Sequence, residues 1–321
     1  TSRDSVWLMN DALRWIEQLL EQRLNEKGLA WYRVASAEVV TGVSDLRFAS
    51  LLSVASRSCR LGELNPSDDQ RAEAGTILIG WEPERWKTLE ATRVALILSR
   101  PDLGAEGVVS ALESCFAHAD EGELCALYRS LAFLPDGERF AWRSGEGCRT
   151  NMLTVFEANA CDTPYPSSHL DVLAWRQLVM KSLFVGAPVW RVKGLDRRLD
   201  AELARMALDL ADERRSAHRA VQPELWLCLG EHAGERGRLA LEAELFDESA
   251  APLGRAAACM GLGRSGRTDL LRSHLGREVD PLVSDTIDRV LEGRCHHSDW
   301  RHIEQLSLSP ELIEERPDAI L

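Results

Sequence analysis

The chain has 321 residues, more than a single hydrophobic core usually requires, so two lobes or one elongated array of elements are expected. Hydrophobic residues make up 45% and charged residues 28%, as in ordinary globular proteins, and no run reaches the roughly 20 apolar residues of a membrane-spanning helix. The formal net charge of -13 argues against nucleic acid or an anionic membrane as a partner, because both require a basic surface.

The eight cysteines are scattered along the chain and form no CxxC pair. Several stand in apolar helical contexts, as Cys115 does within residues 111–116. This usage is typical of reduced thiols that serve as small core residues. Residues 1–10 show no basic stretch followed by an apolar run, so no secretory signal is visible. We therefore expect a cytoplasmic protein.

Apolar residues recur at helical spacing through the N-terminal region, residues 1–135. They predict an amphipathic first helix over residues 7–24. Ser67 and Gln70 form a predicted capping box, which opens a helix that ends near Gly80. Other helices are expected around residues 39–40 and 46–54 and over residues 85–99, 106–119 and 121–134, before Pro135 and Gly137 break the chain.

The C-terminal region, residues 136–308, continues the helical period. A strongly apolar helix capped by Ser168 and Asp171 ends at Gly186, and residues 186–199 form the longest irregular segment. Asp280 followed by Pro281 predicts a helix N-terminus. Further helices are expected over residues 150–161, 201–220, 238–246, 249–261, 268–276 and 281–292, with a short one from 224 and a mobile tail at 309–321.

Alternating strand patterns are nearly absent, so we predict an all-α fold. Short helices joined by tight turns favour an irregular array of stacked antiparallel helix pairs, a HEAT-like α-solenoid. Residues 256–263 followed by Leu270 and Leu271 resemble a degenerate HEAT-type repeat, although no strict internal period exists. The two regions are expected to pack as one array; a compact multi-helix domain is the alternative.

Gly261, Gly263 and Gly266 spell GxGxxG, the pattern of a dinucleotide-binding loop. That loop must follow a buried β-strand, whereas the preceding residues here are alanines typical of a helix. We interpret the glycines as a helix C-terminus and a turn. No HExxH, GxSxG or P-loop pattern occurs, so no catalytic residue and no cofactor are predicted.

Five residues near the C-terminus carry side chains that transition metals prefer. Their spacing matches no zinc motif, and Ser298 has the character of a helix N-cap that would splay them apart. We therefore interpret them as solvated surface residues and predict no metal site. They are Cys295, His296, His297, Asp299 and His302.

Polar side chains interrupt apolar helices between residues 149 and 226. In one interpretation they line a polar pocket between helices, with the segment 186–199 as its rim. In the other, Lys181 pairs with a carboxylate such as Glu157 or Glu213 and only fixes helix register. The candidate ligand-binding residues are Asn151, Glu157, Asn159, Trp175, Gln177, Lys181, Asp196 and Arg198.

The same part of the chain resembles the EboA family, most strongly from Arg149 to Trp226. The family often has Asn-Pro-Tyr-Pro where this chain has Thr163 before Pro164, so any role of that asparagine does not carry over. The segments that carry the resemblance are residues 157–159, 164–166, 175–186, 194–198, 203–206, 212–214 and 223–226.

The resemblance implies a bacterial protein encoded beside a UbiA-type prenyltransferase, a TatD-like hydrolase and sugar-phosphate enzymes, in a cluster that makes or moves a secondary metabolite. It implies no cofactor and no catalytic residue. Our first hypothesis is a non-catalytic protein that binds a small metabolite or other proteins of its cluster. An acid-base enzyme near residues 149–226 and a scaffold in contact with the membrane-bound prenyltransferase are the alternatives.

Overall fold

The computed structural model describes residues 3–59 and 62–309, and within these ranges it contains helices and no strand. Glu63 and Lys87 form an isolated antiparallel β-bridge, which belongs to no strand. The predicted all-α class is confirmed. The chain divides into two compact units, Thr1–Leu178 (unit 1) and Val179–Leu321 (unit 2), whereas the sequence suggested a boundary at 135/136.

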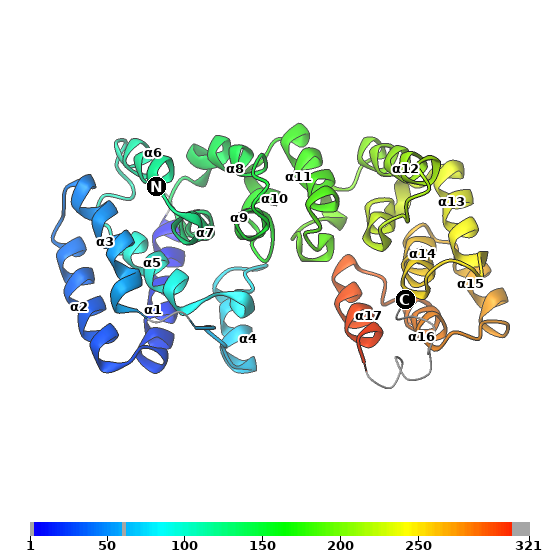
Figure 1. Ribbon diagram of the computed structural model, residues 1–321, viewed down its shortest axis with the longest axis horizontal. Coiled ribbons are helices and arrows are strands. Elements are labelled where there is room, and N and C mark those ends of the chain that lie inside the picture. The colour runs from blue at the N-terminus through cyan, green and yellow to red at the C-terminus, as the bar shows by residue number, and fades with distance from the viewer. Residues whose placement is uncertain (1–2, 60–61, 310–321) are drawn as a thin grey trace. The chain divides into compact units, whose positions relative to one another are not determined.

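Unit 1 is assembled from short α-helices joined by turns and 3₁₀ helices (Figure 1). Its elements are α1 (Arg3–Arg23), α2 (Glu26–Val40), α3 (Asp45–Ser58), α4 (Asp68–Ile77), η1 (Pro83–Arg85), α5 (Thr88–Leu98), α6 (Val108–His118), α7 (Glu121–Ser130), η2 (Leu131–Phe133), η3 (Gly137–Phe140), α8 (Ala141–Gly147), α9 (Leu153–Ala160) and α10 (Tyr165–His169). Helix α11 (Val172–Val185) carries the boundary between the units.

Helix α5 is the centre of unit 1. Every residue from Thr88 to Leu98 is buried, because α1, α2, α3 and α7 all pack against it. Most of its residues are apolar, as a helix without a solvent face requires, and its charged residues Glu90 and Arg93 form ion pairs with neighbouring elements. Beside it, Trp81 makes edge contacts with Trp15 and Phe133, each at a ring-centroid distance of 4.8 Å. The tryptophans here serve helix packing.

Unit 2 follows the same plan (Figure 1). Its elements after α11 are η4 (Val189–Arg191), η5 (Asp196–Arg198), α12 (Ala201–Ser216), η6 (Pro223–Cys228), η7 (Gly230–His232), α13 (Gly234–Phe246), α14 (Pro252–Arg264), α15 (Thr268–Leu275), α16 (Pro281–Leu291), η8 (His297–Asp299) and α17 (Trp300–Ser307). Helix α14 is the centre of this unit. Residues Gly254–Leu262 are all buried, with α13, α15, α16 and α17 packed around them.

The GxGxxG pattern belongs to helix packing. Gly261 and Gly263 lie within α14, and Gly266 follows it with φ +77°, as expected of a residue after a helix C-terminus. A Cβ atom on Gly261 would lie 2.6 Å from Leu241 Cδ2 of α13, and one on Gly263 would overlap Val290 of α16. The glycines therefore allow α13 and α16 to approach α14 closely, and their context is that of a helix, not of a dinucleotide-binding loop.

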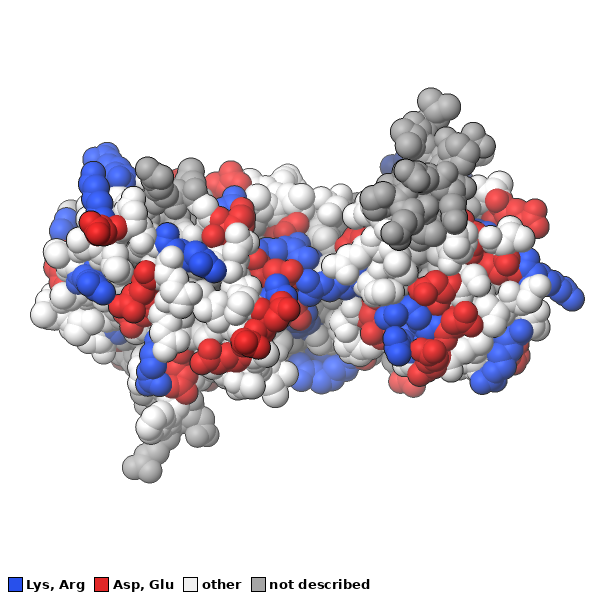
Figure 2. Space-filling model, turned by 90° about the horizontal axis from the view of Figure 1, so that it is seen from below, with Lys and Arg blue, Asp and Glu red and all other residues white. Residues whose placement is uncertain are grey.

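The surface charge is spread among ion pairs. On α12 and α13, Arg236 contacts Asp209 at 2.8 Å and Asp212 at 2.6 Å, which links the two helices. Figure 2 shows acidic and basic side chains interspersed over the face it presents. Exposed pairs of this kind contribute at most about 1 kcal/mol each. None of the helices described here combines the length and the apolar character needed to cross a membrane.

Several predicted boundaries move in the structure. Helix α9 begins at Leu153, three residues after the predicted start at 150, and the irregular segment 186–199 contains the 3₁₀ helices η4 and η5. The helix expected from Glu224 is the 3₁₀ helix η6. Except for Ser309, the predicted mobile tail lies outside the described residues.

The close approach at Gly263 gives a stability prediction. Gly263→Ala should lower the free energy of unfolding by about 1–3 kcal/mol, because the added methyl group overlaps Val290 in a packed core. Helix propensity alone would make the alanine variant more stable by about 1 kcal/mol. A loss of stability would therefore show that the close packing around Gly263 outweighs helix propensity. Urea denaturation followed by circular dichroism measures the change. Gly276→Ala, where no atom lies within 4 Å of the new Cβ, is the matched control; equal stability of the two variants would contradict the packing role.

Candidate functional site

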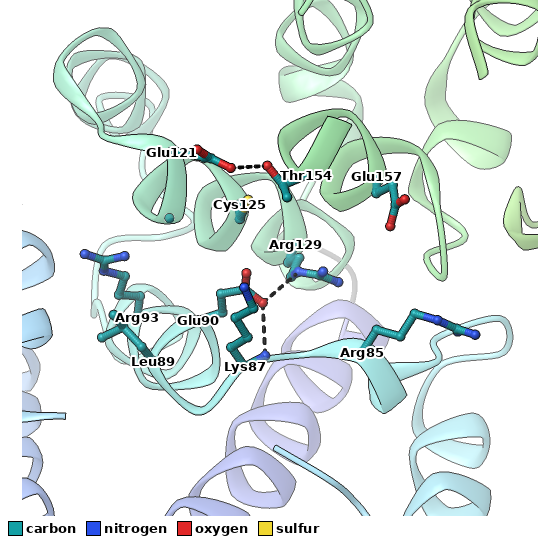
Figure 3. Close-up of a pocket in the computed structure, with 11 residues that line it drawn as sticks. Arg85, Lys87, Leu89, Glu90, Arg93, Glu121, Cys125, Arg129, Thr154 and Glu157 are labelled. Atoms are coloured by element: carbon teal, nitrogen blue, oxygen red, sulfur yellow. Dashed lines mark hydrogen bonds and ion pairs between the residues drawn. The ribbon is translucent and has the colours of Figure 1, made fainter. Parts of the chain in front are cut away.

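A cavity of about 360 Å³ lies in unit 1, where α5, α7 and α9 meet (Figure 3). The side chains on α7 come from positions four apart, since Glu121, Cys125 and Arg129 share one face of that helix. Thr154 and Glu157, three positions apart, share a face of α9. The Thr154 hydroxyl donates a hydrogen bond to Glu121. The full lining is Arg85, Lys87, Leu89, Glu90, Arg93, Glu121, Gly122, Cys125, Arg129, Thr154 and Glu157.

A buried ion pair forms one wall of this unit 1 cavity. Glu90 and Arg129 are each 8% exposed, and Arg129 Nε lies 3.3 Å from Glu90 Oε2. The backbone N–H of Lys87 donates to the same carboxylate oxygen at 3.1 Å. The Arg129 guanidinium also lies over the ring of Trp86, 5.5 Å from its centroid. Separating this buried pair would leave an uncompensated charge inside the protein, which is strongly unfavourable. The pairing therefore holds both side chains in place.

Arg93 is buried more deeply, at 2% exposure, and is held from several directions. Its Nε donates to the Leu52 carbonyl oxygen at 2.9 Å, and its Nη atoms lie 3.9 Å from Asp120 and 3.5 Å from Glu123. A Cβ atom on Gly122 would stand 2.9 Å from Arg93 Nη1. The glycine thus leaves the space that the guanidinium occupies.

The lining is amphipathic and slightly positive. Its four basic side chains and three carboxylates give a formal charge of +1, although the whole chain carries -13. Leu89 and Cys125 supply apolar surface. Burial raises the pKa of the Cys125 thiol to about 12, so this group stays protonated at neutral pH and is a poor nucleophile. Such a cavity can hold a small molecule with an apolar body and an anionic group.

The sequence-predicted residues of unit 1 occupy different surroundings. Glu157 lines the unit 1 cavity. Asn159 is buried and binds Ser144, accepting from its hydroxyl at 2.8 Å and donating to its carbonyl oxygen at 2.9 Å. Asn151 is exposed at the start of the α9 region. Asn159 therefore joins α9 to α8 and does not face the cavity.

The remaining predicted residues are also separated. On α11, Trp175 is fully buried and Gln177 is exposed, while Lys181 is partly buried. In unit 2, Asp196 and Arg198 lie on η5, and Asp196 lines a second cavity, of about 410 Å³. The structure thus places Glu157 and Asp196 in described cavities of different units.

Sequence reasoning missed Arg93, Arg129 and Glu90, which shape the unit 1 cavity. The signal at Arg93 was available, because a basic residue followed by the apolar run Val94 to Leu98 must find a partner inside the fold. The same argument had drawn attention to Lys181. For Arg129 and Glu90 the sequence shows two charged residues on separate helices, and only folding reveals their pairing.

A third cavity, of about 160 Å³ in unit 2, contains an unusual carboxyl group. The backbone N–H of Trp190 donates to Glu224 at 3.1 Å, and its indole N–H donates to Glu304 at 3.2 Å. Burial raises the pKa of Glu224 to about 7; the Glu304 charge adds to the increase, while the Trp190 amide opposes it. Glu224 is thus able to exchange a proton near neutral pH.

The raised pKa of Glu224 makes stability depend on pH. Between its ordinary value of 4.5 and about 7, the folded protein keeps a proton that the unfolded chain releases, so folding becomes less favourable as pH rises. Glu224→Gln keeps the acceptor for Trp190 and removes this effect. It should stabilise the protein at pH 8 by up to about 3 kcal/mol and change little at pH 5. Denaturation midpoints at both pH values measure this.

Glu248→Gln is the matched control, because Glu248 is exposed and the charge change is the same. Glu248→Gln should change the stability of the protein by the same amount at pH 5 and at pH 8. Equal effects of Glu224→Gln at pH 5 and pH 8 would contradict a raised pKa.

Comparison with known proteins identifies the family. No curated protein and no solved structure matches the chain. A family model described as metabolite traffic protein EboA matches residues 12–230, more than half of the chain. The matched range contains every residue that lines the unit 1 cavity. The resemblance seen in the sequence is confirmed, and the chain belongs to the EboA family of metabolite traffic proteins.

Proposed function

We propose that the protein binds a small anionic metabolite of its own gene cluster in the unit 1 cavity and does not transform it. The observation that carries the proposal is the positive, partly apolar lining of this cavity in a strongly acidic chain. Its volume of about 360 Å³ lies within the range of small-molecule sites, about 300–1,000 Å³. The family description, metabolite traffic, is consistent with a carrier.

Arg129 is the group best suited to meet the anion. Its guanidinium is buried, and its Nε donates no hydrogen bond to any described residue, although Glu90 lies close enough for an ion pair. Arginine binds carboxylate and phosphate groups through parallel N–H donors, and such bonds are about twice as strong as neutral ones. A ligand anion would share the guanidinium with Glu90. Lys87 and Glu157 would contact the polar edge of the ligand, and Leu89 its apolar body.

The cellular setting is part of the same proposal. Six of the eight cysteines are buried as small core side chains, the usage expected in a reducing compartment. We place the protein in the cytoplasm, where it would pass its ligand to, or receive it from, an enzyme of the cluster. The membrane-bound prenyltransferase is one such partner.

An acid-base enzyme is the second candidate, and Glu224 is the observation that favours it. A carboxyl group with a pKa of about 7 beside a cavity is suited to proton transfer at neutral pH. In this case a metabolite bound by the protein would be converted, and Glu224→Gln would stop the conversion while leaving binding intact. If the Glu224→Gln variant converted the metabolite as fast as the unchanged protein, Glu224 would be excluded as the acid-base group.

Native mass spectrometry on protein purified from its host, with the cluster intact and with it deleted, tests the carrier. We expect an added mass with the intact cluster only. A clean mass for the protein alone, with partner proteins copurifying, would contradict the carrier and support a scaffold.

Substitutions then locate the site. Lys87→Gln should weaken binding of the identified metabolite about 3- to 10-fold, roughly 1 kcal/mol, because it removes one exposed charge at the cavity. The double variant Arg129→Met with Glu90→Gln removes the buried pair without leaving a lone charge, and should weaken binding by more than about 10-fold. Isothermal titration calorimetry measures both.

Lys27→Gln, which removes an exposed lysine elsewhere in unit 1, is the control and should bind normally. Unchanged affinity in both cavity variants would show that the ligand binds elsewhere.

A further inference from the structure

Three side chains of unit 2 come together from distant parts of the chain. Asp196 lies on η5, and His297 lies 101 residues further along, on η8, preceded by His296. His296 Nε2 is 3.2 Å from Asp196 Oδ2, and His297 Nδ1 is 3.2 Å from Asp196 Oδ1. One nitrogen or oxygen atom from each residue lies within 4.8 Å of the other two. The two rings are adjacent, with centroids 4.2 Å apart.

These separations suit a shared metal ion. Zinc binds imidazole nitrogen and carboxylate oxygen at about 2.0–2.2 Å, so two of its ligands stand roughly 3–4 Å apart. Both histidine–aspartate separations already fall in this range. The widest separation in the cluster needs to shorten by less than about 1 Å. A rotation of the exposed His296 side chain is enough for such a change.

His297 is an independent sign of a missing ligand. Its residue is only 2% exposed, so it is not the solvated surface residue that the sequence suggested. Neither ring nitrogen makes a hydrogen bond to a described residue, although Nδ1 lies beside Asp196. Buried polar atoms without a hydrogen bond are uncommon in folded proteins and call for a partner.

The surroundings hold the carboxylate in position. Asp196 forms an ion pair with Arg264 and accepts a hydrogen bond from the His297 backbone N–H at 3.0 Å. Such outer contacts orient metal ligands. The Arg264 charge also opposes a dication, so we expect micromolar and not nanomolar affinity.

His296 has a fixed orientation as well. Its Nδ1 accepts a hydrogen bond from the Ser298 backbone N–H at 3.3 Å and lies 2.7 Å from Ser298 Oγ. These contacts fix the ring with Nε2 beside Asp196, where a bound cation would replace the Nε2 proton. The sequence placed the N-cap of the following helix at Ser298; in the structure His296 caps η8, and this turns its ring toward Asp196.

We propose that Asp196, His296 and His297 form a binding site for a divalent transition metal, with zinc as the expected ion. Two imidazoles and one carboxylate suit this class of ion. The remaining coordination positions would face the 410 Å³ cavity that Asp196 and His296 line. This site is separate from the proposed metabolite site, which lies in unit 1.

The test uses full-length protein without a polyhistidine tag, stripped with a chelator and then titrated with Zn²⁺ by calorimetry. We expect one ion per chain at micromolar affinity. His296→Ala changes an exposed side chain and should weaken binding at least about 10-fold. Asp196→Asn should do the same, and Co²⁺ absorption should report nitrogen and oxygen ligands. Circular dichroism confirms that each variant is folded.

His302→Ala and Cys295→Ser are the matched controls, because each removes a metal-preferring side chain close to the cluster in sequence. Both should retain the affinity of the unchanged protein. No stoichiometric binding, or equal binding by His296→Ala, would overturn the proposal. Loss of binding in Cys295→Ser or His302→Ala with none in His296→Ala would overturn it as well, by assigning the ion to other ligands.

Discussion

Each unit depends on a helix that is buried on every side, and such a helix can contain a charge only if its partners are built around it. In unit 1 the helix is α5, and Arg93 donates to the Leu52 carbonyl oxygen. In unit 2 it is α14, and Arg255 donates from Nε to the Leu245 carbonyl oxygen at 3.0 Å while pairing with Glu278. In both units the central helix is tied to its neighbours by a guanidinium.

This constraint also shapes the unit 1 cavity. The buried helix α5 can contain Glu90 and Arg93 because the elements around it supply partners for both charges. The same two side chains line the space between α5, α7 and α9. The charged wall is therefore held by contacts within unit 1 itself. A preformed arrangement of this kind lowers the ordering cost of binding, which is consistent with the metabolite binding proposed above.

Local features of the fold were readable from the sequence, because short-range chemistry decides them. The capping box of Ser67 and Gln70 and the N-cap at Asp280 are both present, and the helical period of the apolar residues predicted the all-α class. The sites were less readable, because they depend on pairing between distant residues. Asp196 and His297 show this, since neither has a sequence neighbour that points to the other.

The two proposed sites differ in how much of each lies within the segment that matches the family model. The matched residues end at 230, so the unit 1 cavity lies wholly inside the part of the chain that defines the family. Asp196 lies inside it too, but His296 and His297 lie beyond it. The proposed metabolite site at α5, α7 and α9 therefore needs nothing from the histidine pair. The histidine pair, in contrast, needs Asp196, whose carboxylate joins the end of the described chain to the matched segment.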